Sequence, residues 1–242
     1  NGRLISSNQY GVEYHPIKEL HNIANDNPDE SFEYSRYWHG YLTILRPLLL
    51  LFNINTIRVI LVTLICGLLI YVLKLIYQKL GIGLSIVFFI AFLLTEMFVI
   101  GISLQGSPIV IIMLISAIRV LKNEKISMLN FMIIGSLTNF FDFLTAPIIT
   151  LAIPLILDIL IKQNKNNYTI KEYLKMICIP STIWLLGYAG TWIAKWIIVQ
   201  LFCNRNMFEI AFEQIKYRSF NTQCTYYLEF ACIFKQLLNG IP

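Results

Sequence analysis

The chain has 242 residues, of which 57% are hydrophobic and 14% are charged, and its mean hydropathy is +0.64. Soluble domains average about 25% charged residues, so this composition argues against a soluble protein and predicts an all-α, polytopic bundle of membrane-spanning helices. The net charge of +5 would suggest nucleic acid as a partner of a soluble protein, but the excess lies in turns beside apolar runs, where membrane topology explains it.

Residues 1–55 are expected to form an extracytoplasmic segment with one interfacial helix. The apolar stretch 41–52 contains Arg46 and Pro47, and as a helix it would extend over only about 18 Å, too short to cross a bilayer. A helix lying in the membrane interface suits it better. The chain begins at Asn1 with no signal peptide before it, and we expect a fragment of a longer protein.

Six apolar segments are expected to cross the membrane, because a crossing helix needs about 20 mostly apolar residues. The short third and fourth segments could instead form a re-entrant hairpin. Its tip would then bury several charges at about 2.5–3.5 kcal/mol each, so two crossings are favoured. The six segments are 56–77, 83–104, 108–121, 126–140, 143–161 and 175–202.

The charges in the turns predict the orientation. The turns 74–79, 119–125 and 162–175 hold nine Lys and Arg residues, whereas the turns 105–107 and 139–142 hold none. The positive-inside rule places the basic turns in the cytoplasm. The N-terminal segment and the tail 203–242 then lie outside the cell, and the tail is expected to carry an amphipathic helix at 207–216.

Common signatures of catalysis and of metal binding are missing from the sequence. There is no Walker loop, HExxH, GxSxG or dinucleotide fingerprint. The five cysteines form no CxxC pair and no Cys/His cluster. We therefore predict no metal and no cofactor.

A cluster at 33–41 combines four aromatic rings with charged groups near the predicted outer surface. Aromatic faces beside a cation suit a sugar or a phosphate head group, which makes Arg36, Trp38 and His39 candidate substrate-binding residues. Glu33 is a candidate catalytic carboxylate at the start of the same cluster. The alternative is an aromatic belt that only anchors the protein at the interface.

Two further carboxylates are candidate catalytic residues. Asp142 lies between phenylalanines in a predicted outer turn, and its alternative role is to cap the next helix. Glu96 interrupts the second segment, and an intramembrane carboxylate is a functional candidate unless it is a protonated or hydrogen-bonded packing residue. Lys195 and Gln105 are candidate binding residues near the same outer side, and Lys195 could instead snorkel to the interface.

Two strings carry a resemblance to known families. Arg36-Tyr37-Trp38-His39-Gly40-Tyr41 and 138–143 (TNFFDF) resemble a group of bacterial multi-pass membrane proteins of the Firmicutes type, and that likeness implies no activity. A more distant similarity is to C-type glycosyltransferases, polytopic enzymes that take a sugar from a polyprenyl-phosphate carrier on the outer face. In that superfamily an acidic residue of the first outer loop is the catalytic base, and Asp29, Glu30 or Glu33 would match it by position only.

Three functions are consistent with this pattern. The first is an outward-facing transferase, or accessory protein in cell-surface glycan assembly, whose partner is a lipid-linked sugar and whose carboxylate acts as general base. The second is a transporter or flippase, which proline-broken spans and Glu96 would favour. The third is a membrane subunit without catalytic activity.

Overall fold

The computed structural model describes residues 3–4, 32–33, 37–123, 128–141 and 146–203. The chain divides into two compact units, one formed by residues 37–194 and the other by residues 1–36 together with 195–242. In the second unit, strand β1 (Arg3–Leu4) pairs antiparallel with β2 (Phe32–Glu33), with Arg3 opposite Glu33. The rest of the described chain is helical, as the composition predicts.

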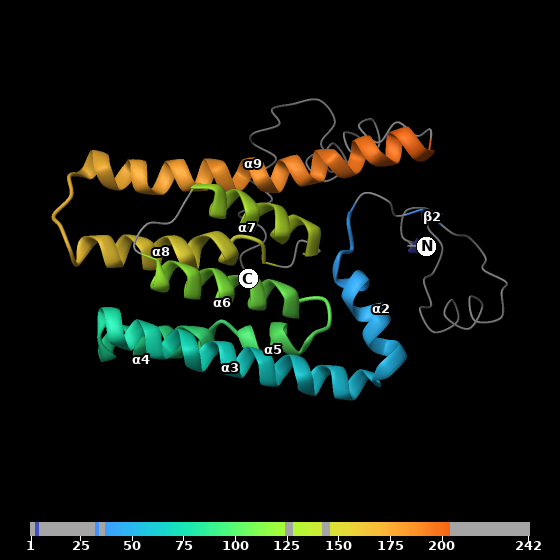
Figure 1. Cartoon of the computed structure of the whole chain (residues 1–242), viewed down its shortest axis with the longest axis horizontal. Coiled ribbons are helices and arrows are strands. Elements are labelled where there is room, and N and C mark those ends of the chain that lie inside the picture. Colours follow the sequence, from blue (N-terminus) through green and yellow to red (C-terminus); the bar gives the residue numbers. More distant parts are fainter. Residues whose placement is uncertain (1–2, 5–31, 34–36, 124–127, 142–145, 204–242) are drawn as a thin grey trace, which may run out of the picture. The chain divides into compact units, whose positions relative to one another are not determined.

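Helices occupy all six segments that the sequence predicts to be apolar spans (Figure 1). Two of the described helices, α3 and α9, are long and apolar enough to cross a membrane by length and composition. The others have 16 or fewer residues, or about 24 Å at most. The helices are α2 (Tyr41–Leu51), α3 (Ile54–Leu80), α4 (Ile82–Leu94), α5 (Met97–Ile102), α6 (Ser107–Lys122), α7 (Met128–Phe141), α8 (Ile149–Gln163) and α9 (Ile170–Cys203).

The second predicted segment, 83–104, is not one continuous helix. It is divided into α4 and α5 by Thr95 and Glu96, and Glu96 has the left-handed φ of 53°. Beyond the break, Gly101 lies so close to the side chain of Ile65 that a Cβ atom would collide with it. The break therefore redirects the chain and lets α5 pack directly onto α3.

The interfacial segment predicted at 41–52 forms α2, a helix without a buried residue. Leu50 is 86% exposed and Leu51 is 75% exposed, so the apolar surface of this helix is uncovered. The next helix begins at Asn53, whose side chain accepts a hydrogen bond of 2.8 Å from the backbone N–H of Thr56. Asn53 is thus the N-cap, and it has the extended backbone typical of that position.

Two apolar clusters hold the unit 37–194 together. The larger is built from α3, α6 and the helices beside them, and it buries Val72, Val110 and Leu114 completely. The smaller joins α7, α8 and α9 around Phe131, Leu155 and the Trp184 ring. Burial of such side chains stabilises by about 25 cal/mol per Å² of apolar surface, and here it fixes the helices side by side.

The unit 37–194 carries most of its described Lys and Arg side chains at one end. The C-terminal ends of α3, α6 and α8 lie together with the start of α9, and we call this the basic end. The Nζ of Lys122 on α6 lies 5.1 Å from the centre of the Tyr71 ring on α3, which confirms that these helix ends are adjacent. The described cations of the basic end are Lys74, Lys79, Arg119, Lys122, Lys162, Lys165, Lys171 and Lys175.

The two acidic side chains described at the basic end are engaged locally. Asp158 is buried and accepts a hydrogen bond of 2.6 Å from Lys162, one turn further along α8. Glu172 accepts hydrogen bonds from the backbone N–H and the hydroxyl of Thr169 and so caps the start of α9. Both described carboxylates of this end therefore bond to residues three or four positions away in the chain.

Candidate functional site at the aromatic end

Three segments that are far apart in the sequence meet at the opposite end of the unit, which we call the aromatic end. They are residues 37–41, the last turn of α7, and Thr191 with Trp192 on α9. The indole Nε1–H of Trp38 donates a hydrogen bond of 2.8 Å to the carbonyl oxygen of Thr191. The backbone N–H of Gly40 donates one of 2.9 Å to the carbonyl oxygen of Phe140. The two strings that the sequence singled out therefore touch each other.

Close contact at Gly40 depends on the absence of a side chain. A Cβ atom at this position would collide with both the carbonyl oxygen and the ring of Phe140. The preceding residue, His39, has the left-handed φ of 52°, which costs about 1–3 kcal/mol for a non-glycine residue. This conformation turns the chain between Trp38, which reaches α9, and the start of α2.

Aromatic rings continue along α9 at a spacing of four residues. The rings of Trp184 and Tyr188 stack with centroids 5.0 Å apart, and Tyr188 meets Trp192 edge to face at 6.4 Å. The Tyr37 ring then stacks on Trp192 at 5.7 Å. Each such pair contributes about 0.5–1.5 kcal/mol beyond area burial, so the rings fix residues 37–41 against α9.

The first of these rings, Trp184, contacts a pair of buried hydroxyl groups. The hydroxyls of Thr138 and Thr150 are wholly buried and 2.8 Å apart. The indole N–H of Trp184 donates to the Thr150 hydroxyl at 3.3 Å. Because unpaired buried polar groups cost about 1–3 kcal/mol each, this network ties α7, α8 and α9 into one arrangement.

The backbones of α7 and α9 approach closely at two glycines. A Cβ atom on Gly135 would collide with the backbone of Trp184, and one on Gly187 would collide with the backbone of Met132. Between them, the Ser136 hydroxyl donates to the carbonyl oxygen of Gly187 at 3.2 Å. Small residues at a helix contact allow backbones to approach this closely.

Within the unit 37–194, the described candidate residues lie at different places in the fold. Trp38 and His39 lie at the aromatic end, half-buried beside Phe140 and Tyr41. Gln105 lies in the turn between α5 and α6 and is half-buried. Glu96 is exposed at the break of α4 and has no side-chain hydrogen bond or ion pair within the described residues.

Other candidates cannot be assigned to this site. Asp142 and Arg36 lie outside the described residues, as does the predicted helix at 207–216. Glu33 is described only as part of β2, and Lys195 is a half-buried residue of α9; both belong to the second unit. Within the described ranges, no three His, Cys, Asp or Glu side chains gather into a group that could hold a metal ion.

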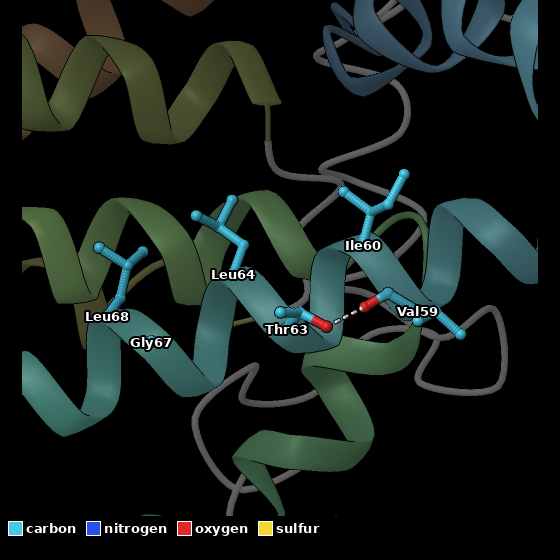
Figure 2. Close-up of a pocket in the computed structure, with 6 residues that line it drawn as sticks. All are labelled: Val59, Ile60, Thr63, Leu64, Gly67 and Leu68. Atoms are coloured by element: carbon cyan, nitrogen blue, oxygen red, sulfur yellow. Dashed lines mark hydrogen bonds between the residues drawn. The ribbon is translucent and has the colours of Figure 1, made fainter.

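An apolar groove of about 510 Å³ runs along the exposed face of α3 (Figure 2). Its one lining hydroxyl, that of Thr63, is bonded to the carbonyl oxygen of Val59 at 2.8 Å. A Cβ atom on Gly67 would meet nothing within 4 Å. The groove offers hydrocarbon contact and no group for catalysis; its lining residues are Val59, Ile60, Thr63, Leu64, Gly67 and Leu68.

Several residues of the aromatic end were not predicted as site residues. The i, i+4, i+8 spacing of Trp184, Tyr188 and Trp192 is a signal that one helical face carries the rings. Nothing local in the sequence marks Thr138 and Thr150 as partners, because their contact joins two different helices. The role of Gly40 likewise follows only from its approach to α7.

Comparison of the chain with protein-family models, with curated proteins and with solved structures yields no match.

Proposed function

We propose that the chain is an integral membrane protein that crosses the bilayer six times, with α4 and α5 forming one broken crossing. The proposed orientation has the basic end in the cytoplasm and the aromatic end outside. The exposed apolar surface supports membrane placement, because soluble monomers rarely expose large contiguous apolar patches. Examples on three different helices are Ile70 at 67%, Leu94 at 77% and Leu186 at 62% exposure.

We further propose that the aromatic end binds a lipid-linked sugar and transfers the sugar, or assists its transfer, in cell-surface glycan assembly. The observation that carries this proposal is the meeting of residues 37–41 with the last turn of α7 and with Thr191 and Trp192 of α9. Ring faces such as Tyr37, Trp38 and Trp192 suit the apolar faces of a sugar. The charged candidates that the sequence singles out are Arg36, Asp142 and Lys195.

The proposed reaction is a glycosyl transfer. An acceptor hydroxyl attacks the anomeric carbon, its proton passes to a carboxylate, and the bond from that carbon to the lipid phosphate oxygen breaks. Asp142 directly follows Phe141, the last residue of α7, and is the proposed base. Arg36, with His39 or Lys195, is proposed to hold the phosphate that leaves.

The test is to replace Asp142→Asn, His39→Ala and Glu96→Gln one at a time and to quantify surface polysaccharide at matched protein levels. Asp158→Asn, a carboxylate change at the basic end, is the control. The proposal predicts that Asp142→Asn abolishes the polysaccharide and that His39→Ala reduces it, while Asp158→Asn leaves it unchanged. Unchanged polysaccharide in all three test variants would refute sugar transfer.

Transport is a second candidate, favoured by one specific observation. Broken helices with polar groups at the break are a feature of transporters, and α4 breaks at Glu96. Transport predicts that Glu96→Gln abolishes uptake of a labelled solute, whereas Asp142→Asn and His39→Ala leave uptake intact. Uptake that is intact in Glu96→Gln but lost in Asp142→Asn and His39→Ala would exclude this form of transport.

A further inference from the structure

The junction between α4 and α5 places polar atoms within an exposed apolar surface. On one side of the junction Leu93 is 47% exposed and Leu94 is 77% exposed, and on the other Val99 is 62% exposed. Glu96 is exposed between them. A carboxyl group is thus surrounded by side chains suited to hydrocarbon.

The backbone hydrogen bonds of the junction are incomplete. The N–H of Thr95 reaches the carbonyl oxygen of Ala91 at 3.0 Å, and the N–H of Glu96 reaches that of Leu93 at 3.2 Å. The carbonyl oxygens of Leu94 and Thr95 accept no hydrogen bond within the described residues. Two carbonyl oxygens and one carboxylate, all adjacent along the chain, thus lack a hydrogen-bond partner within the described residues.

The conformation of Glu96 is costly where glycine would be easy. A non-glycine residue in the left-handed region costs about 1–3 kcal/mol and marks a place where structure is maintained for a reason. Glycine would adopt the φ of 53° without this cost, but it would remove the carboxylate. The side chain is the feature that a glycine could not supply.

The membrane placement proposed above makes these open atoms significant. The 13 residues of α4 extend about 20 Å from the basic end, so the junction would lie within a hydrocarbon core of about 30 Å. Irregular backbone is tolerated at that depth only where it is covered by protein or lines a water-filled cavity. A charged carboxylate facing lipid would cost about 2.5–3.5 kcal/mol.

Neighbouring helices supply little charge to balance Glu96. In the described part of the chain, α4 and α5 contain no Lys or Arg. The cations of α3 and α6 lie at the basic end, except Arg58 near the start of α3. A mobile cation that enters from water would neutralise the carboxylate, and carbonyl oxygens at helix breaks are known to coordinate such ions.

We propose that the α4–α5 junction is a water-accessible site for a small monovalent cation, held by the Glu96 carboxylate and the carbonyl oxygens of Leu94 and Thr95. One carboxylate neutralises one positive charge, which favours a monovalent ion such as sodium. This inference rests on the membrane placement of the proposed function and is independent of sugar transfer.

The test measures thiol accessibility in the full chain reconstituted into liposomes, with the five native cysteines replaced by serine. Thr95→Cys places a thiol at the junction, and Ile86→Cys places one on the 51%-exposed apolar face of α4. Each is treated with a cationic or an anionic water-soluble methanethiosulfonate. We expect Thr95→Cys to react about tenfold faster with the cationic reagent than with the anionic one, because a carboxylate concentrates cations. We also expect this reaction to be slower in sodium than in the same concentration of a bulky organic cation.

Two variants at the carboxylate are added to Thr95→Cys to identify its contribution. Glu96→Gln and Glu96→Asn should both abolish the reagent preference and the protection by sodium, and asparagine keeps the left-handed conformation accessible. Equal rates with both reagents and no effect of sodium would refute the cation site. A Thr95→Cys thiol as slow as Ile86→Cys would refute water access, whereas a fast Ile86→Cys thiol would refute the membrane placement itself.

Discussion

The two ends of the unit 37–194 differ in the kind of contact that their side chains make. At the basic end, the two described carboxylates bond to residues three or four positions away, as Asp158 does with Lys162. At the aromatic end the important contacts join residues far apart, such as Trp38 with Thr191. The difference teaches that charge marks one end of this protein and packing builds the other.

The largest expected effect tests whether the aromatic end depends on close backbone packing. Gly187→Ala should lower the free energy of unfolding by about 3 kcal/mol, because the added methyl would overlap the backbone of Met132. Gly190→Ala on the same helix has open space around its Cβ and should raise stability by up to about 1 kcal/mol. Thermal unfolding of the purified proteins in detergent gives both values, and equal shifts would contradict the α7–α9 contact.

A smaller effect is expected from the buried hydroxyls. Thr150→Val should cost about 1–3 kcal/mol, because it leaves the Trp184 indole without its acceptor and removes one of the two hydrogen-bond partners of the Thr138 hydroxyl. Thr150→Ser should restore most of that stability. Thr182→Val is the control, because the exposed Thr182 hydroxyl bonds only to a carbonyl of its own helix. If Thr182→Val costs as much as Thr150→Val, the buried network has no special role.

The junction between residues 37–41 and α9 can be weakened by one hydrogen bond. Trp38→Phe retains a ring beside Phe140 but removes the indole donor to Thr191, which should cost about 1 kcal/mol. Chemical denaturation followed by α9 tryptophan fluorescence would measure it. No change in stability would indicate that this hydrogen bond does not hold the segment against α9.

The smallest effect is expected at the basic end. Lys122→Gln removes the exposed cation over the Tyr71 ring, and such a contact is worth about 0.5–1 kcal/mol at most. Thermal unfolding in detergent, as used for the glycine variants, measures this loss of stability. A loss as large as that of Gly187→Ala would erase the contrast between the two ends.

The sequence predicted the helical segments and the location of the basic end because these depend on local patterns. Apolar runs and charged turns can be counted without knowing which helices touch. The break at Glu96 was not predicted, since an apolar run around one carboxylate is compatible with a continuous helix. The approach of Gly101 to Ile65 that accompanies the break is a contact between separate helices.

Prediction of the candidate site was limited by the same distinction. Trp38 and His39 were identified from a dense aromatic string, and the structure brings that string to Phe140. Thr150 carries no such signal, because it gains its role from partners on two other helices. Glu96 was singled out as a candidate catalytic residue, and the structure places it at a helix break and not among the described contacts of the aromatic end.

The most direct test of the account asks which end of the unit faces the cell exterior. Single thiols at Asn123→Cys and Lys165→Cys, in a chain without other cysteines, report the basic end. The proposed orientation predicts that a membrane-impermeant thiol reagent leaves both positions unlabelled in intact cells and labels both after the cells are opened. Labelling of the two positions in intact cells would contradict it and would remove the basis for an outward-facing site at the aromatic end.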